Sequence, residues 1–271
     1  MITIRGNYKP TFFCKFLCLL IALLSMGFHQ PGESRKYRVK KIILDAGHGG
    51  KDSGAVGKFS KEKDIALQVT LALGNLIKKH MKDVQVIYTR QQDEFIPLYQ
   101  RSSMANKNNT DLFISIHCNA AEKNKNSHGV EIFTMGLEKS NQNLTVAKRE
   151  NGVILIEDDF EYTYQGFDPK SPESHILFSL YQNVYSENSL KLAQYIEEGF
   201  AMHTKRKRRG IKQDGFLILW QTTAPSVLVE VGFITHPEEE QYLCKKHGQN
   251  EIVTAIFEGI RKYKTDIETR K

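Results

Sequence analysis

Short apolar segments alternate with amphipathic stretches after the first 40 residues, and this alternation restricts the possible folds more than any other feature of the chain. The segments 42–44, 84–88 and 112–116 are short and apolar, as buried strands are. Between them, the segments 62–80 and 98–106 are expected to be helices, the first with apolar residues near the 3.6-residue helical period. This order predicts an α/β fold in three layers, with a mixed, mainly parallel central sheet flanked by helices on both faces.

The pattern continues in the second half of the chain after one interruption. The segment 130–133 extends the predicted sheet, and the alternation then lapses for roughly 45 residues. We interpret about residues 137–186 as an insertion in the domain, because a long irregular segment in a compact domain is usually a lid or a loosely ordered loop. Beyond it we expect helices at 189–202 and 252–263, and strands at 216–219 and 227–231.

The composition is that of a globular protein. The chain has 271 residues, of which 40% are apolar and 25% charged, and this balance excludes disorder over most of its length. No Pro-, Gly- or Ser-rich linker divides it. We therefore expect one domain at 40–265, preceded by a short linker at 28–39 and followed by a C-terminal tail at 266–271.

The first 27 residues have the features of a secretory signal peptide. Basic residues precede the apolar run 16–24, and small residues follow it. The run is too short to be a membrane span by its length alone. We predict a signal peptide at 1–27, export to a bacterial periplasm, and no stable membrane span after cleavage. An uncleaved N-terminal anchor is the alternative.

Two histidines and two glutamates lie where predicted strands and helices begin or end. His48 follows the first strand, Glu62 begins the first helix, and His117 follows the third strand. Glu230 lies near the end of a late strand. In open α/β sheets, ligands bind outside the carboxyl ends of the strands, so residues distant in sequence meet there. Two imidazoles and one carboxylate form the ligand set of a catalytic zinc that keeps a fourth position open for water.

Glu230 is the carboxylate that remains to transfer protons at such a site. Its apolar neighbours Val229, Val231 and Phe233 should raise its pKa, as a general acid/base requires. Zinc activates water and polarises a carbonyl oxygen, which is the chemistry of amide hydrolysis. The residues therefore predict a metal-dependent hydrolase without specifying its substrate.

Each of these residues has an ordinary structural interpretation when it is considered alone. His48 could be a turn residue in a Gly-rich loop, and His117 could be a core histidine. Glu62 could simply complement the dipole of its helix. Asp45 and Asp52 are placed to orient the loop or the second ring nitrogen of a ligand histidine.

Four blocks of sequence resemble the signature motifs of one enzyme family. They are 45–55 (Asp-Ala-Gly-His-Gly-Gly-Lys-Asp-Ser-Gly-Ala), 62–64 (Glu-Lys-Asp), 115–120 (Ser-Ile-His-Cys-Asn-Ala) and 226–234 (Ser-Val-Leu-Val-Glu-Val-Gly-Phe-Ile). In this order they resemble the zinc-dependent N-acetylmuramoyl-L-alanine amidases of the amidase_3 type, over about residues 41–263.

The resemblance implies a function for the predicted domain. It implies that 40–265 is an amidase catalytic domain, that His48, Glu62 and His117 bind Zn²⁺, and that Glu230 is the catalytic carboxylate. The implied reaction is hydrolysis of the amide between N-acetylmuramic acid and L-alanine in peptidoglycan, for cell-wall remodelling or daughter-cell separation.

The insertion has a counterpart in some members of this family. Those used at cell division carry an inserted helix that covers the zinc with an acidic side chain until a protein activator displaces it. The segment 143–159 lies where such a helix would fall. By this resemblance Glu150, or one of Glu157, Asp158 and Asp159, would meet the metal, and a surface insertion without a regulatory role is the alternative.

The basic run 205–209 is the densest cluster of charge in the chain. Aromatic residues are not interleaved with it, so we expect a solvated loop and no nucleic-acid partner. Attraction to an anionic wall polymer is a weaker alternative. For the whole chain, the alternatives to an amidase are another metal-dependent peptidoglycan peptidase and a catalytically inactive wall-binding protein.

Overall fold

The structure is a computed structural model that describes residues 37–269 apart from 122–125, 137–140 and 180–183. The predicted signal peptide at 1–27 and most of the predicted linker lie outside the described residues. In the part that is described, no helix is both long and apolar enough to cross a membrane.

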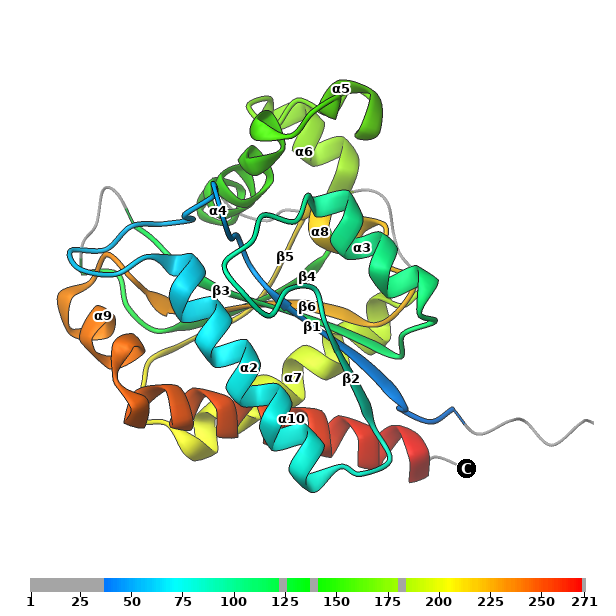
Figure 1. The fold of residues 1–271 in the computed structure, drawn as a ribbon, viewed down its shortest axis with the longest axis vertical. Helices are drawn as coiled ribbons and strands as arrows, with labels where there is room; N and C mark the ends of the chain where they lie inside the picture. Colours follow the sequence, from blue (N-terminus) through cyan, green and yellow to red (C-terminus); the bar gives the residue numbers. More distant parts are fainter. Residues whose placement is uncertain (1–36, 122–125, 137–140, 180–183, 270–271) are drawn as a thin grey trace, which may run out of the picture. The chain divides into compact units, whose positions relative to one another are not determined.

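A six-stranded sheet forms the centre of the described unit, with the strand order β2-β1-β3-β6-β4-β5 (Figure 1). Its strands are β1 (Lys41–Ala46), β2 (Gln85–Tyr88), β3 (Leu112–Asn119), β4 (Val130–Met135), β5 (Arg208–Asp214) and β6 (Ser226–Phe233). Strands β2, β1, β3 and β6 are parallel, β4 pairs antiparallel with β6, and β5 pairs parallel with β4. The expected mixed, mainly parallel sheet is confirmed.

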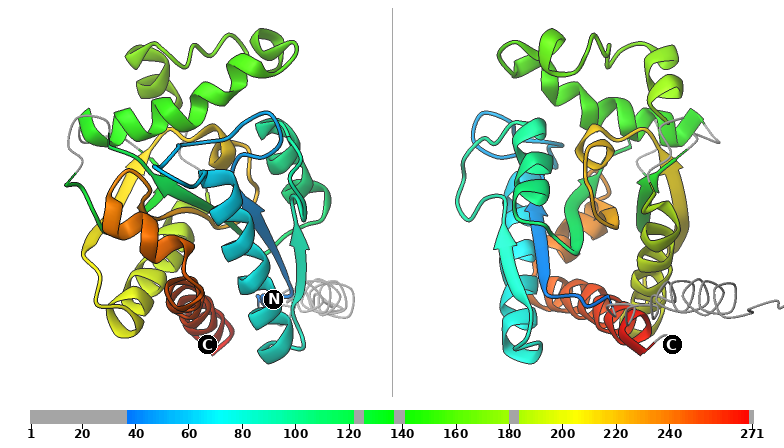
Figure 2. Two further views of the ribbon diagram at one scale, coloured as in Figure 1. Left: turned by 60° about the vertical axis from the view of Figure 1, so that its left-hand side comes forward. Right: turned by 90° about the vertical axis from the view of Figure 1, so that its right-hand side faces the viewer.

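Helices cover both faces of this sheet (Figure 2). One face carries α2 (Glu62–His80), α7 (Ser186–His203) and α10 (Lys246–Thr269), and the other carries α3 (Leu98–Lys107) and α8 (Leu217–Trp220). Successive residues of β1 point to opposite faces, so Ile42 and Leu44 belong to one apolar core and Ile43 to the other. The short helix α9 (Pro237–Cys244) follows β6 and precedes α10.

The helix α2 shows why the sequence pattern predicted these elements well. Its buried side chains include Ile65, Val69, Leu73 and Ile77, which recur every four residues and form one apolar face. Acidic residues occupy its first turn and basic residues its last turn, which complements the helix dipole. The helix begins at Glu62, so this glutamate lies at the edge of the sheet where the strands end.

The insertion is helical, whereas the sequence led us to expect an irregular segment. It contains α4 (Asn141–Asn151), the 3₁₀-helix η1 (Gly152–Ile156), α5 (Phe160–Thr163) and α6 (Pro172–Ser179). Ile154, Tyr164, Phe167 and Phe178 are buried together with Leu217 of α8, so the insertion has a small apolar core that is anchored on the domain.

Two elements differ from the prediction. The apolar segment 216–219, expected to be a strand, lies instead at the start of α8. A short apolar run that is buried on several sides has no periodicity by which a strand and a helix can be told apart. The basic run 205–209, expected to be a solvated loop, is in part a strand, because its last two residues begin the edge strand β5. Arg208 is exposed and forms an ion pair with Glu197, and Arg209 forms one with the buried Glu131.

Candidate metal centre and active site

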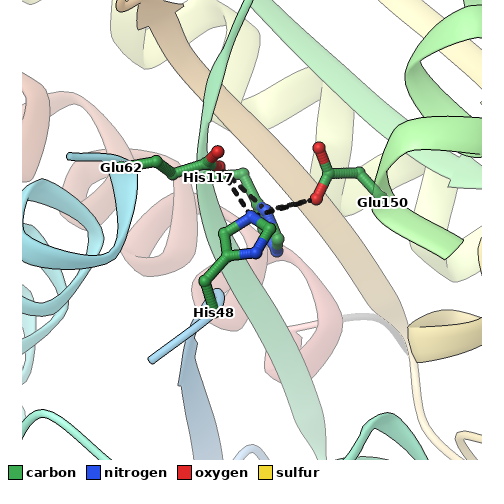
Figure 3. A group of neighbouring side chains, drawn as sticks. All are labelled: His48, Glu62, His117 and Glu150. Carbon is green, nitrogen blue, oxygen red and sulfur yellow. Dashed lines mark hydrogen bonds and ion pairs between the residues drawn. The ribbon is translucent and has the colours of Figure 1, made fainter. Parts of the chain in front are cut away.

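Four side chains that can bind a metal ion converge at the carboxyl ends of β1 and β3 (Figure 3). His48 lies in the loop after β1, Glu62 begins α2, His117 lies in β3, and Glu150 lies in α4. All four are buried, and one nitrogen or oxygen atom of each lies within 4.8 Å of the corresponding atom of every other. The three predicted ligands therefore come together, and the insertion contributes a fourth donor.

The donor atoms face one another directly. Glu62 Oε1 lies 3.1 Å from both His48 Nε2 and His117 Nδ1. Glu150 Oε2 lies 2.9 Å from His117 Nδ1 and 3.2 Å from His48 Nε2. His48 Nε2 and Glu150 Oε2 are buried, and each directs its lone pair or proton at the other donor atoms of the cluster.

This arrangement fits a divalent cation. His48, Glu62 and His117 are the two imidazoles and one carboxylate of catalytic zinc sites, and Glu150 lies where such sites have an open position. Burial acts to lower the pKa of His117, but the charge of Glu150 and hydrogen bonds to Glu150 and Glu62 raise it to about 9. Burial acts to raise the pKa of Glu62, but His48 and His117 bring it down to about 2. The carboxylates therefore stay ionised and attract positive charge, which a metal ion supplies when it displaces the protons of the imidazoles.

The loop after β1 is shaped so that His48 reaches this cluster. His48 has a φ of 61°, a left-handed conformation that few residues other than Gly adopt. A Cβ at Gly47 would lie 2.4 Å from the His117 ring, so only glycine lets the loop pass over that imidazole. Gly54 packs in the same way against His48 and Glu62.

Asp45 and Asp52 lie next to the donors, and their hydrogen bonds show that each has a different role. Asp52 Oδ2 lies 2.7 Å from His48 Nδ1 and thus orients the second ring nitrogen. Asp45 is buried and accepts hydrogen bonds from Thr89, Ser115 and Arg101. It therefore acts on the loop, since the same Arg101 donates to the carbonyls of Ala46 and His48.

Glu230 lies beside the cluster, on the neighbouring strand β6. Its Cα is paired in register with that of His117 across β3 and β6, so both side chains arise at the same height of the sheet. Glu230 is fully buried, and burial raises the pKa of its carboxyl well above the usual range in spite of the nearby Arg149 guanidinium. Its Oε2 makes no hydrogen bond. The expected raised pKa is present, but Val229 and Val231 point to the opposite face of the sheet, and the groups that act on the carboxyl are charged, with Arg149, Glu150 and Glu62 among them.

Arg149, which the sequence interpretation did not consider, covers this carboxylate. Its Nη2 lies 3.1 Å from Glu230 Oε1 and 2.7 Å from Glu150 Oε1. Its Nη1 donates to Asn119 Oδ1 and to the Ala120 carbonyl, at 3.1 Å each. Adjacent residues of α4 thus contact the metal-ligand cluster and the predicted catalytic carboxylate. A basic residue next to Glu150 was the only signal in the sequence.

One known protein family matches most of this chain. A family model described as N-acetylmuramoyl-L-alanine amidase, Amidase_3, matches residues 42–262. The chain belongs to this family. It is therefore a hydrolase of the amidase class, as the four sequence blocks predicted.

Individual relatives agree with this assignment. The chain is 33% identical to "N-acetylmuramoyl-L-alanine amidase AmiA" of Escherichia coli, over 88% of this chain and 81% of that protein. It is 35% identical to "N-acetylmuramoyl-L-alanine amidase AmiC" of Escherichia coli over 88% of this chain, and spans just over half, 56%, of that longer relative.

Solved structures of amidases share the fold. An N-acetylmuramoyl-L-alanine amidase from Clostridium difficile superimposes with a TM-score of 0.63 and 27% identity, covering 84% of this chain and 97% of that one. The catalytic domain of CwlV from Bacillus (Paenibacillus) polymyxa superimposes with a TM-score of 0.59 and 28% identity, covering 84% and 99%.

The insertion of this amidase is attached to the domain at points other than the metal-ligand cluster. Glu157 accepts hydrogen bonds from the Leu98 amide, at the start of α3, and from the Tyr164 hydroxyl. The Tyr99 amide donates to the same hydroxyl. We call Glu157 and Tyr164 the clasp. The clasp satisfies two amides at the first turn of α3 that have no partner within that helix.

The loop after β1 and the insertion also border a cavity next to the cluster. Lys51 of the loop donates to the Ile156 carbonyl at the end of η1, at a distance of 2.6 Å. The cavity is lined by Glu150 and Val153 of the insertion and by residues of the domain, which include Asp45, His48, Arg101 and His117. The insertion therefore closes the site from one side.

Proposed function

We propose that this amidase hydrolyses the amide bond between N-acetylmuramic acid and L-alanine in peptidoglycan, with a zinc ion held by His48, Glu62 and His117 and with Glu230 as the proton-transferring group. The observation that carries the proposal is the buried group of converging donor atoms beside a fully buried carboxyl. Family membership supplies the substrate class.

Different residues would hold the metal ion and transfer protons in this reaction. Zinc bound here would supply Lewis-acid activation of water and of the scissile carbonyl. Glu62 is held by the amides of Ala55 and Cys118, and Asp52 orients His48, so the ligands are arranged before any ion binds. Glu230, buried beside the cluster, accepts a proton from the attacking water and donates one to the leaving nitrogen.

The closed insertion supports a second part of the proposal, that the free enzyme is autoinhibited. Glu150 takes the place of the fourth donor, where water or substrate would bind, and Arg149 pairs with Glu230. Among the acidic residues considered, Glu150 lies in the cluster, Glu157 caps α3, and Asp158 and Asp159 are exposed. An activating protein would have to displace α4 to open the site.

The predicted signal peptide at 1–27 supports a proposed location of this activity in the periplasm. Peptidoglycan and an activating protein are thus the proposed partners. Another peptidoglycan peptidase activity and a catalytically inactive wall-binding protein are the rival functions.

Mass spectrometry of purified muropeptides tests the reaction. The full chain, loaded with zinc and carrying Glu150→Ala to open the site, should release free stem peptides and peptide-free glycan. Adding Glu230→Ala should reduce the rate of muropeptide hydrolysis about 10²–10⁴-fold or more, since general acid–base catalysis alone contributes about that much. Cleavage within the stem peptide would identify the rival peptidase, and binding to the wall without any cleavage would identify the inactive binder.

The autoinhibition is tested by the same assay without an activator. Glu150→Ala should hydrolyse muropeptides faster than the unsubstituted chain, whereas Glu161→Ala, an exposed glutamate of the same insertion, should not. An equal or lower rate for a folded, zinc-loaded Glu150→Ala variant would contradict autoinhibition.

A further inference from the structure

The guanidinium of Arg149 lies among hydrogen-bond acceptors that belong to the catalytic domain. Glu230 Oε1, Asn119 Oδ1 and the Ala120 carbonyl oxygen each lie 3.1 Å from one of its terminal nitrogens. These three oxygens come from the ends of the neighbouring strands β3 and β6. The domain thus presents a set of acceptors beside the predicted catalytic carboxylate, and a donor from the insertion satisfies them.

The orientation of the Asn119 side chain is set by a second buried carboxylate. Asn119 Nδ2 donates to Glu131 Oε2 at 2.7 Å, and a carboxylate can only accept that bond. The oxygen of the amide must therefore face Arg149. Glu131 is 2% exposed and is held in turn by Arg209 and by Lys212, whose Nζ lies 2.8 Å from Oε1.

Opening of the site leaves these acceptors in place. Asn119, Ala120 and Glu230 belong to β3, the loop after it and β6, whereas Arg149 belongs to the insertion. Withdrawal of α4 would take the Arg149 donor away from buried Glu230, from the part-buried Ala120 carbonyl and from Asn119 Oδ1, which would keep only the bond from the Ala120 amide. This loss is costly unless water or substrate replaces the donor.

We propose that Asn119 Oδ1 and the Ala120 carbonyl form a subsite for the N–H of the scissile amide and for the amine that leaves, and that Arg149 occupies this subsite as an internal mimic. The inference rests on the proposed function.

Hydrolysis breaks the C–N bond, adds hydroxyl to the carbonyl carbon and adds a proton to the nitrogen. The nitrogen therefore gains positive character next to Glu230, where acceptors stabilise it.

Asn119 is in this view a substrate-binding residue, and Glu131 is a positioning residue that acts through it. A substrate that lacks the N–H group distinguishes this role from a purely structural one. An ester analogue with L-lactate in place of L-alanine has an oxygen at that position and offers no hydrogen to Asn119.

The first test compares the two substrates in the full, zinc-loaded chain with Arg149→Ala and Glu150→Ala. Adding Asn119→Ala should lower kcat/KM for the amide about 10–100-fold, as expected for a hydrogen bond to a group that becomes charged. It should lower kcat/KM for the ester only a few-fold. Asn106→Ala, which removes an asparagine hydrogen-bonded to Gln221 and Thr223 away from the site, is the matched control. Equal losses on amide and ester would overturn the proposal.

The second test needs no hydrolysis and so separates the subsite from the proposed function. Calorimetry should detect ethylguanidinium binding to Arg149→Ala, in which the acceptors lack the guanidinium donor, and not to the unsubstituted chain. Binding should weaken at least about tenfold in Arg149→Ala with Asn119→Ala, the loss expected for one such hydrogen bond. Equal affinity in both variants, or no binding to Arg149→Ala, would overturn the subsite even if the amidase activity is found. If Asn119→Ala does not fold, Asn119→Ser serves for both tests.

Discussion

At the scale of single residues, the candidate metal centre depends on groups that do not contact the ion. Asp52 holds the Nδ1 side of His48, and this bond sets the direction in which Nε2 points. The Gly47 backbone passes directly over the His117 ring, where a methyl group would collide with it. Motif residues around the ligands are therefore explained by packing and orientation as much as by chemistry.

Replacing Asp52 tests this dependence. We expect Asp52→Ala to bind zinc about 10–100-fold more weakly, the usual cost of losing a group that orients a histidine ligand. Competition with a chelator of known affinity measures the change. Asp158→Ala, at an exposed position of the insertion, should bind zinc as the unsubstituted chain does. Unchanged affinity in Asp52→Ala would show that the His48 ring is oriented by other contacts.

At the scale of elements, the clasp links the insertion to the start of α3. Burial is the largest influence on the Glu157 carboxyl and raises its pKa. The Leu98 amide, the Tyr164 hydroxyl and the charges of Arg101 and Lys51 act in the opposite direction and do not cancel it. The clasp therefore holds a carboxyl that loses its proton less readily in the folded state than in the unfolded chain.

This pKa predicts how stability changes with pH. The folded state binds a proton at Glu157 more tightly than the unfolded state, so the contribution of Glu157 is greatest below the unfolded pKa. It is lost as the pH rises through the folded pKa. Compared with Glu157→Gln, which does not titrate, the unsubstituted chain should lose stability as the pH rises from about 4 to 7. Urea unfolding at several pH values measures the difference, and a constant difference would contradict this sign.

A second contact between elements joins α7 and α10 through glycines. A Cβ at Gly259 would lie 2.5 Å from the Ile196 Cα atom, and a Cβ at Gly199 would lie 2.1 Å from the Ala255 carbonyl oxygen. Both obstacles are backbone atoms, which cannot rotate away. The two helices can approach this closely only because neither glycine has a side chain.

We expect Gly259→Ala to destabilise the fold by about 1–3 kcal/mol, as overpacking of a core does. Urea denaturation measures the free energy of unfolding. Gly152→Ala is the control, because a Cβ there meets no atom within 4 Å. That variant should be equally stable or slightly more stable. A Gly259→Ala variant as stable as the control would mean that α7 and α10 can move apart at little cost.

At the scale of the whole molecule, the ligands are brought together by folding. His48, Glu62, His117 and Glu150 lie on a loop, two helices and a strand that only the complete sheet arranges around one point. An ion that binds this group binds the folded state in preference to the unfolded chain. Metal binding and folding are therefore linked.

Removal of the metal should reveal this linkage. Zinc at a free concentration 100 times its Kd adds about 2.7 kcal/mol to the stability. For a domain of this size the corresponding rise in Tm is roughly 5–10 °C. Calorimetry before and after treatment with a chelator measures the shift, and added zinc should restore it whereas magnesium, which prefers oxygen ligands, should not. An identical Tm with and without zinc would contradict binding at this site.

The sequence alone was sufficient to predict the helices and strands that have a local hydrophobic pattern, and the site residues that lie in motifs of the family. The periodicity of α2 and the short apolar runs of β1 and β3 identified the sheet and its helices, because one buried face leaves a repeating pattern in the chain. The blocks around His48, Glu62, His117 and Glu230 identified the candidate site, because each block is continuous in sequence and resembles a family motif.

Only the tertiary structure decided which side chains of the insertion reach the site. Val146 and Ala147 pack α4 onto the core, and Asn151 bonds to the backbone of Gly215 and Leu217, so Arg149 and Glu150 are the residues that face inward. Contacts between residues distant in sequence set the orientation of α4, and no local pattern encodes them. The helical state of α8 also depended on tertiary packing, because a short segment that is buried from several directions has no periodic pattern in its sequence.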